Sequence, residues 1–279
     1  MSEKILVLGA NGNVGRPLVQ ALLAKGERVK AASRSGTAIG GAEGAVFDYD
    51  KPETFATAFD GVDRAYVLLP GGNVNSRELL TPVIEALAAR KVKVVLQTAL
   101  GVDADDSIPY RQVELALERS GTPCVILRPN WFADNFHNFW LGGILQGNIA
   151  LPAGEGKTSF IDVRDIAASA AAVLTTHRFD GQAFNLTGAT AHSYAEAATL
   201  IGSTIDKPVR YTAIDDETFV RNMVQIGLSE AYARFLAMIF YPVREGWTAA
   251  VNDTVQTLTG QPARSLQDYL RDHVRDLKG

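Results

Sequence analysis

The chain has 279 residues, of which 47% are hydrophobic and 21% charged, so it is long enough to bury a sizeable core in one large domain or two smaller ones. Its formal net charge of −4 lacks the basic excess that binding to nucleic acid or to an anionic membrane surface requires. The single cysteine, Cys124, excludes an internal disulfide framework and a cysteine-rich zinc site.

Too few residues precede the first apolar run to form a signal peptide, and no apolar run approaches the ~20 residues that span a bilayer. The sequence therefore predicts a soluble, cytoplasmic protein.

The first half of the chain alternates short apolar runs with helical patterns. The apolar runs predict strands at 5–8, 29–32, 45–47, 65–69, 92–96 and 124–127, and the patterns between them predict helices at 17–24, 52–59, 79–89 and 113–119. This alternation is typical of α/β proteins. It predicts a Rossmann-type, doubly wound parallel sheet with helices on both faces.

After about residue 130 the pattern changes. Residues 130–140 are rich in aromatic side chains, residues 142–156 predict a loop, and residues 159–173 predict one more strand and helix. A strand at 183–186, mostly helical residues at 194–240 and an edge strand at 209–212 follow. We therefore expect an NAD(P)-binding core of residues 1–130, to which 159–187 return, and a smaller, mainly helical substrate lobe of residues 131–158 and 188–279.

A glycine-rich turn follows the first predicted strand. Gly9, Gly12 and Gly15 are spaced G-x-x-G-x-x-G, and Pro17 opens a helical pattern. The first glycine permits a sharp turn, the second removes the Cβ that would block a pyrophosphate, and the third lets the helix pack closely on the strand. The helix start then favours phosphates. The turn predicts a dinucleotide site made by Gly9, Asn11, Gly12, Asn13, Val14 and Gly15.

The end of the second strand predicts which dinucleotide is bound. NAD-binding folds place an acidic residue there for the ribose 2′-hydroxyl, but this chain has Arg34 and Ser35. A guanidinium suits a 2′-phosphate, so we expect NADP(H) to be preferred over NAD(H). At the end of the third strand, Asp48 and Tyr49 border the expected adenine site, and an ordinary turn is the alternative for that pair.

The chain resembles the NmrA-like branch of the atypical short-chain dehydrogenases, which includes triphenylmethane reductase and NADPH:quinone reductases. The resemblance covers nearly the whole chain. Its motifs are the glycine turn with Arg34, residues 47–54, 61–70, 120–132, 159–167 and 258–266, and Tyr269. It implies further cofactor contacts from Leu69, Pro70, Thr98, Asn130, Trp131 and Phe132. The family contains both reductases and NADP-sensing regulators, so the resemblance leaves activity open.

The residues expected to carry acid–base chemistry depart from the short-chain dehydrogenase pattern. The usual Tyr-x-x-x-Lys is here Tyr110-Arg-Gln-Val-Glu114, and a carboxylate near a tyrosine raises the pKa of the phenol instead of lowering it. Tyr110 remains a candidate proton donor, with a pocket wall as the alternative. His137 is the second candidate, and a packed histidine is its alternative.

The aromatic segment predicts a pocket for a flat acceptor. We expect the substrate pocket to be lined by Trp131, Phe136, His137, Trp140, Tyr241 and Trp247. The alternative is that this cluster forms the hydrophobic core of the smaller lobe. A conjugated acceptor needs little acid assistance, because hydride delivery to a delocalised system depends mainly on positioning.

The leading hypothesis is an NADPH-dependent oxidoreductase that transfers hydride to a small conjugated or aromatic acceptor, such as a quinone or a dye. The alternatives are a non-catalytic NADP(H)-binding redox sensor of NmrA type, and an isomerase or lyase on the same fold. The four histidines have no metal-ligand spacing, so no metal is expected. A homodimer is one candidate oligomeric state.

Overall fold

The structure is a computed structural model that describes residues 3–279, and it consists of two compact units. Unit 1 contains the described residues up to Pro129 together with Val163–Leu186 and Thr254–Gln261. Unit 2 contains Asn130–Asp162, Thr187–Asp253 and Pro262–Gly279. The division differs from the predicted lobes at α11 (Thr254–Thr259), which contacts a helix and a strand of unit 1.

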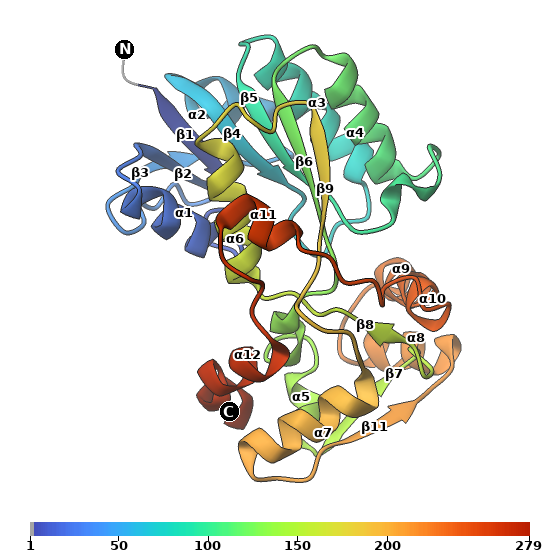
Figure 1. Cartoon of the computed structure of the whole chain (residues 1–279). Helices are drawn as coiled ribbons and strands as arrows, with labels where there is room; N and C mark the ends of the chain where they lie inside the picture. The colour runs from blue at the N-terminus through green and yellow to red at the C-terminus, as the bar shows by residue number, and fades with distance from the viewer. Residues whose placement is uncertain (1–2) are drawn as a thin grey trace. The chain divides into compact units, whose positions relative to one another are not determined.

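Unit 1 is built on a seven-stranded sheet in the order β3-β2-β1-β4-β5-β6-β9, and every pair of neighbours is parallel (Figure 1). The strands are β1 (Lys4–Leu8), β2 (Val29–Ser33), β3 (Glu43–Val46), β4 (Val62–Leu68), β5 (Lys93–Gln97), β6 (Cys124–Pro129) and β9 (Gln182–Leu186). This confirms the doubly wound α/β prediction.

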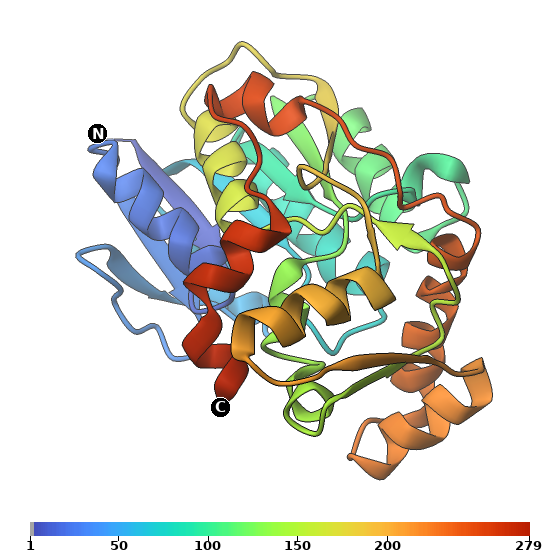
Figure 2. The same ribbon diagram turned by 60° about the horizontal axis from the view of Figure 1, so that its bottom comes forward.

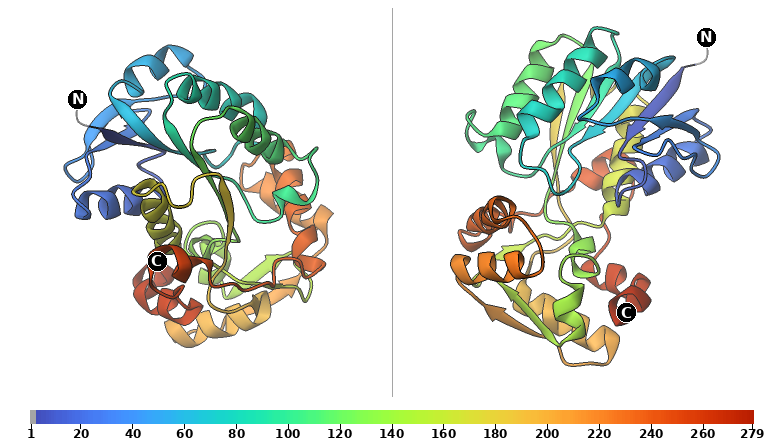
Figure 3. Two further views of the ribbon diagram at one scale, coloured as in Figure 1. Left: turned by 45° about the horizontal axis from the view of Figure 1, so that its top comes forward. Right: turned by 180° about the vertical axis from the view of Figure 1, so that it is seen from behind.

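Successive side chains of a strand point to opposite faces of the sheet, and here those on both faces are apolar and buried. Helices therefore cover both faces. Leu6 and Leu8 pack with α2 (Phe55–Ala58), α3 (Ser76–Ala88) and α4 (Pro109–Arg119), and the last two lie side by side (Figure 3, left). The intervening Ile5 and Val7 are also buried, on the other face, where α1 (Gly15–Ala24) and α6 (Val163–Leu174) contact each other (Figure 2).

Unit 2 has two small sheets and most of the short helices. Parallel β7 (Asn148–Leu151) and β11 (Arg210–Ala213) form one sheet, and antiparallel β8 (Lys157–Thr158) and β10 (His192–Ser193) form the other. The helices are α5 (Leu141–Leu145), α7 (Tyr194–Ile205), α8 (Asp216–Gln225), α9 (Glu230–Ile239), α10 (Tyr241–Arg244), α12 (Leu266–Asp272) and α13 (Val274–Lys278).

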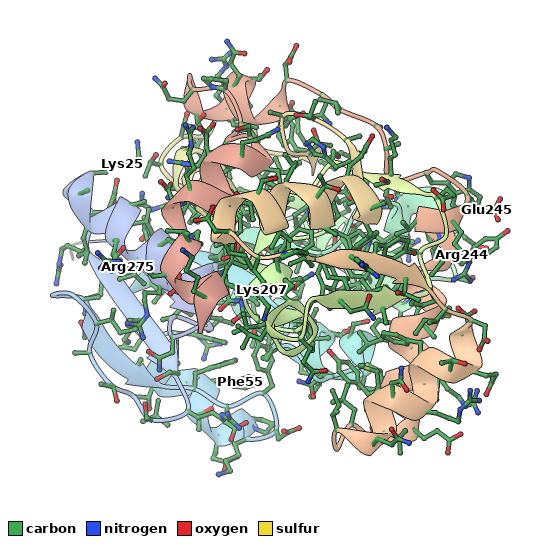
Figure 4. All side chains as sticks on the ribbon, turned by 90° about the horizontal axis from the view of Figure 1, so that it is seen from below. Lys25, Phe55, Lys207, Arg244, Glu245 and Arg275 are labelled. Carbon is green, nitrogen blue, oxygen red and sulfur yellow. The ribbon has the colours of Figure 1, made fainter. Side chains whose placement is uncertain are left out.

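Two charged side chains lie at opposite ends of the β7–β11 pair (Figure 4). Where the strands begin, Lys207 donates to the carbonyl of Leu145. Where they end, Arg244 donates to the carbonyl of Pro152 at 2.5 Å and to both carboxylate oxygens of Asp216 at 2.9 and 3.1 Å.

The sequence prediction was wrong for residues 142–156, which contain α5 and β7 instead of a loop. Two glycines lower the helix propensity of α5, so the sequence pattern does not indicate a helix there. Gly143 is required for the packing, because a Cβ at this position would lie 2.4 Å from the carbonyl oxygen of Asn148. The predicted strand before α6 is reduced to one bridge between Phe132 and Ile161. Nowhere in residues 3–279 is a helix both long and apolar enough to cross a membrane.

Candidate functional site

The carboxyl edge of the sheet in unit 1 is where its topology places a ligand site. From β1 the strand order runs outward to β2 and β3 on one side and to β4, β5 and β6 on the other. In such a sheet the loops after the two central strands diverge and leave a crevice at the switch point, here between β1 and β4.

The glycine turn lies at this switch point. Gly9 has a φ of +66°, a left-handed conformation that glycine adopts without strain, and the amide of Gly12 donates to its carbonyl at 2.9 Å. A Cβ on Gly15 would lie 2.1 Å from the Gly9 oxygen and 2.8 Å from the Cα of Ala10. Gly15 is therefore required for α1 to pack against the turn.

The open side of the turn has room for a ligand. A Cβ on Gly12 would lie 3.2 Å from the Gly9 oxygen, and Asn11, Gly12 and Asn13 are all exposed. Val14 is buried, so its contribution to a ligand would come from its backbone amide. The first amides of a helix lack partners within the helix and point outward, which suits a pyrophosphate.

Three hydroxyl side chains flank Arg34 in sequence at the end of β2. The Oγ atoms of Ser33 and Ser35 lie 3.3 Å apart, and the Oγ of Ser35 lies 2.8 Å from the Oγ1 of Thr37. Arg34 is exposed, and no ion pair joins it or Arg16 to a carboxylate in the described chain. Sequence reasoning did not select Arg16, which follows Gly15 in the first turn of α1, or Thr37, which continues the alternation of Ser33 and Ser35.

Asp48 and Tyr49 are held by the protein itself. The Asp48 carboxylate accepts from the amide of Asp50 at 3.2 Å, which makes a turn after β3. Tyr49 donates its hydroxyl to the carbonyl of Leu68, at the end of β4, and its ring packs edge-on against Phe47 at 4.8 Å. Burial raises the pKa of Tyr49, so the phenol stays protonated.

Leu69 and Pro70 continue the chain beyond β4. Leu69 packs, partly buried, against the apolar cluster beneath α3 and α4. The carbonyl of Pro70 accepts from the side-chain amide of Asn73 at 3.1 Å. Both residues therefore lie beside the switch point, and their contact with a cofactor stays a prediction.

A buried ion network joins the ends of β5 and β6 to α4. Glu114 is fully buried and accepts from Arg128 at 2.7 and 3.0 Å, from Arg111 at 3.0 Å and from the hydroxyl of Thr98 at 2.6 Å. Burial acts to raise the pKa of Glu114, but the bonds from Arg128 and Thr98 outweigh it and hold the pKa below its ordinary value.

This network changes how the Tyr110–Glu114 spacing is understood. Sequence reasoning treated Glu114 as a charge acting on Tyr110, whereas the structure shows its charge balanced by two arginines. Tyr110 packs, half-buried, against the same apolar cluster as Tyr49. The hydroxyl of Thr98 donates to Glu114 and its amide donates to the carbonyl of Leu127 at 2.9 Å, so Thr98 has no donor left for a ligand while those bonds hold.

In unit 2, the side chain of Asn130 is fully used by the fold. Its amide donates to the Oγ of Ser159 at 2.7 Å and to the carbonyl of Thr248 at 2.8 Å, and its oxygen accepts from the amide of Trp131 at 2.9 Å. Phe132 follows in an extended conformation, bridged to Ile161. Asn130 thus fixes the path of this segment, and a direct ligand contact from its side chain would require those bonds to break.

Most of the predicted substrate-pocket aromatics form the core of unit 2. Phe136 is fully buried and contacts Trp140 at 5.0 Å, while Trp131 contacts Phe240 at 4.7 Å. Phe136 is therefore a core residue of unit 2, which was the alternative to a pocket residue. Trp131 and Trp140 are only partly buried, so each presents an edge to the outside of that core.

His137 is packed between two ring systems of the C-terminal helices. Its Nδ1 shares a hydrogen bond with the hydroxyl of Tyr269, and its ring stacks on that of His273 at 4.8 Å. Burial, and then the neighbouring His273, lowers the pKa of His137, although Asp276 opposes this. Because Nδ1 is bonded to Tyr269, a role as proton donor would fall to Nε2.

Tyr241 and Trp247 are separate from the packed cluster. They contact each other edge-on at 5.6 Å and are 47% and 61% exposed, which is unusual for two large aromatic side chains. The Arg244 guanidinium lies 6.0 Å from the Tyr241 ring. Of all the predicted pocket residues, these two offer the most open apolar surface.

In the described part of the chain, no group of three or more histidine, cysteine, aspartate or glutamate side chains is placed to hold a metal ion. The candidate site features are thus the glycine turn at the carboxyl edge of the sheet in unit 1 and the two exposed aromatic side chains of unit 2.

Comparison with known proteins identifies the family. The sequence profile described as the NmrA-like family matches residues 1–246. An uncharacterized oxidoreductase of Bacillus subtilis is 31% identical over 272 residues, covering 97% of this chain and 95% of its own. An NAD(P)H azoreductase of Xenophilus azovorans is 30% identical over 281 residues, covering 97% and 98%.

Solved structures share the fold at lower identity. Citrobacter sp. triphenylmethane reductase complexed with NADP(H) has a TM-score of 0.83 at 23% identity, covering 98% of this chain and all of its own. An Escherichia coli NADPH-dependent quinone oxidoreductase complexed with NADPH has 0.84 at 21%, covering 96% and 99%. NmrA, a negative transcriptional regulator, in complex with NADP has 0.80 at 14%, covering 98% and 96%. Because the profile covers most of the sequence and two relatives match it almost end to end, the chain belongs to the NmrA-like family.

Proposed function

We propose that the protein is an NADPH-dependent reductase that transfers hydride to a small conjugated or aromatic acceptor of the quinone, azo or dye class. The observation that carries the proposal is the glycine turn at the β1–β4 switch point, next to an unpaired Arg34 and three hydroxyls. The names of the azoreductase, quinone oxidoreductase and triphenylmethane reductase support the acceptor class.

The residues of unit 1 fit the phosphates of such a cofactor. Gly12 leaves space where a Cβ would stand, and the N-terminus of α1 offers backbone amides to the pyrophosphate. The Arg34 guanidinium suits a 2′-phosphate, with the hydroxyls of Ser35 and Thr37 beside it. These features support NADP(H) over NAD(H).

The residues of unit 2 suit a flat acceptor. The exposed rings of Tyr241 and Trp247 offer apolar surface on which a conjugated molecule could stack. When bound, NADPH supplies a hydride; a reduced quinone or azo group also takes up one proton, whereas a cationic triphenylmethane dye is neutralised by the hydride alone. Tyr110 and His137 remain the proposed donors of that proton, with solvent water as the alternative source.

Turnover is tested by following the oxidation of NADPH with quinones, azo dyes and triphenylmethane dyes, alongside a simple aliphatic ketone. We expect turnover with at least one conjugated acceptor and none with the ketone, because the chain lacks the Tyr-x-x-x-Lys pair that assists carbonyl reduction. Tight NADP+ binding without turnover of any acceptor would contradict the reductase proposal.

Cofactor preference is tested with Arg34→Ala. Loss of a charge-assisted bond to the 2′-phosphate should weaken NADPH binding by about tenfold or more and leave NADH binding nearly unchanged. Arg119→Ala removes another exposed arginine of unit 1 and serves as the matched control. Equal losses for NADPH and NADH in Arg34→Ala would overturn the preference.

A second function is supported by the lack of a free acid–base pair. Because Glu114 replaces the lysine of the Tyr-x-x-x-Lys spacing and is paired with two arginines, and the Nδ1 of His137 is bonded to Tyr269, the chain could bind NADP(H) and report the redox state without chemistry, as a regulator of NmrA type would. The same turnover panel separates this function from the reductase. An isomerase or lyase would instead convert its substrate with no net consumption of NADPH.

A further inference from the structure

The ion pair between Glu114 and Arg128 is buried in unit 1 at the carboxyl ends of two strands. Glu114 is fully buried and Arg128 is 7% exposed, and two bonds of 2.7 and 3.0 Å join them. Arg128 also contacts Asp103 at 2.5 Å, in the short helix Val102–Ala104. The pair thus connects α4, the end of β6 and the loop that follows β5.

Stability alone does not account for such an arrangement. Removing two charges from water is costly, and apolar residues of similar volume often stabilise a fold as well as a buried ion pair does or better. What the pair supplies instead is geometry, because each bond fixes one element at a set distance and angle. The same carboxylate also holds the hydroxyl of Thr98, the first residue after β5.

The position of these bonds relative to the switch point indicates which half of a bound dinucleotide would lie near them. A dinucleotide crosses the carboxyl edge at the switch, with one half over the strands on each side. Arg34 belongs to the β2 side, where we propose the adenosine half lies. Thr98 and Arg128 belong to the β5–β6 side, where the nicotinamide half would lie. Backbone pairing extends past both strands there, from the amide of Leu100 to the carbonyl of Pro129 at 3.0 Å.

We infer that Glu114 and Arg128 are positioning residues for the nicotinamide half of the cofactor, acting through the backbone at Thr98 and Pro129. The inference rests on the proposed function. At the place where short-chain dehydrogenases carry a catalytic lysine, this chain has a carboxylate that holds two strand ends in register. Glu114 touches neither cofactor nor substrate, and its effect is on where the β5 and β6 ends lie.

The test combines Glu114→Gln with Arg128→Met. Glutamine can still accept from Thr98, and methionine fills much of the arginine volume without charge, so the double variant should stay folded with a melting temperature near that of the wild type. Glu114→Gln alone leaves the buried Arg128 paired with Asp103 but not with a second carboxylate, and should be less stable than the double variant. Affinities are measured for NADPH and for 2′,5′-ADP, which contains only the adenosine half.

We expect the double variant to bind NADPH about tenfold more weakly, because it loses the bonds of Arg128 to Glu114 and Asp103 that fix the β6 end and the loop after β5, and to bind 2′,5′-ADP as the wild type does. Wild-type affinity for NADPH in the double variant would overturn the inference and leave the proposed function intact. So would equal weakening of both ligands, since it would show a general effect on the fold. Failure of the wild type to bind 2′,5′-ADP would instead contradict the proposed NADP(H) site.

Thr98 provides an independent test that keeps the ion pair. Thr98→Val preserves shape and removes the hydroxyl, and Thr98→Ser preserves the hydroxyl. We expect Thr98→Val to weaken NADPH binding without affecting 2′,5′-ADP, and Thr98→Ser to restore it. Identical NADPH affinities in both variants and the wild type would show that the Glu114 bond does not position the β5 end.

Discussion

Gly12 and Gly15 lie in one turn, yet a side chain at each would meet different surroundings. A Cβ at Gly15 would collide with backbone at 2.1 Å, whereas a Cβ at Gly12 would need the Gly9 carbonyl to yield only slightly from 3.2 Å. We expect Gly15→Ala to lower the free energy of unfolding by about 3 kcal/mol, because backbone must move to admit the methyl group.

The matching change at Gly12 should affect binding instead. Gly12→Ala should keep stability within about 1 kcal/mol of the wild type, while NADPH affinity falls because the methyl group occupies the pyrophosphate's approach. Gly142→Ala, where a Cβ meets nothing within 4 Å, is the control for both measurements. Denaturant unfolding and cofactor titration separate the two effects. A Gly12→Ala protein that binds NADPH normally would contradict the assignment of this turn to the cofactor.

Two buried tyrosines in the core of unit 2 differ in whether their hydroxyls form a hydrogen bond. Tyr194 is fully buried between Trp140 and Phe160, and its hydroxyl has no partner in the part of the chain described. Tyr269 is as deeply buried but bonds His137. An unpartnered buried hydroxyl costs free energy, and a partnered one contributes about 1 kcal/mol.

We therefore expect Tyr194→Phe to leave the free energy of unfolding unchanged or raise it by up to about 1 kcal/mol, and Tyr269→Phe to lower it by about 1 kcal/mol. Both changes keep the ring and its packing, so each serves as the other's control. Chemical denaturation measures the difference. A clear loss of stability in Tyr194→Phe would show that its hydroxyl has a partner, such as a buried water.

At the residue scale, the sequence predicted the geometry of the glycine turn better than the surroundings of the aromatic side chains. The glycine spacing is local, so its geometry follows from neighbouring residues alone. Whether Phe136 faces a pocket or a core depends on Phe160, whose ring contacts it at 5.0 Å, and on Tyr194 and Phe240, which belong to the same buried cluster from far along the chain. No local pattern carries that information.

At the scale of elements, α12 is joined to the segment after Ala133–Phe136 by stacked rings. His137, Tyr269 and His273 form this stack, and burial and then His273 lower the pKa of His137 below its ordinary value of 6.5. Below that pH the unfolded chain binds a proton at this position that the folded chain resists. Stability should therefore fall as the pH drops below about 6.5 and be fully present above it.

His137→Phe checks this origin, since it keeps an aromatic ring and removes the titrating group. Unfolding midpoints measured between about pH 5.5 and 7.5 should depend less on pH in the variant than in the wild type. Some dependence should remain, because burial also lowers the pKa of His192. An unchanged slope in His137→Phe would rule out the stack as its source.

The elements of unit 1 were largely predictable. In unit 2 the structure confirms the predicted helices of residues 194–240 and the edge strand at 209–212, but α5 and β7 were missed. Buried parallel strands appear in the sequence as continuous apolar runs, as in β4 and β5, and the helices between them follow from their period. By contrast, β7 has only four residues and pairs with β11 about sixty residues later. The helix before it contains two glycines, which favour a loop unless the tertiary contact at Gly143 is known.

At the scale of the whole molecule, tryptophan fluorescence reports on unit 2 alone, because Trp131, Trp140 and Trp247 all belong to it. Circular dichroism reports on both units. If the cofactor also contacts the predicted segment at Trp131, NADP+ at 100 times its Kd should stabilise both by about 2.7 kcal/mol and raise both melting midpoints by several degrees. The adenosine fragment 2′,5′-ADP should raise the fluorescence midpoint less at the same saturation, because it lacks the nicotinamide half. An unchanged fluorescence midpoint with NADP+, beside a raised midpoint by circular dichroism, would confine the cofactor to unit 1 and exclude Trp131 and Phe132 from its site.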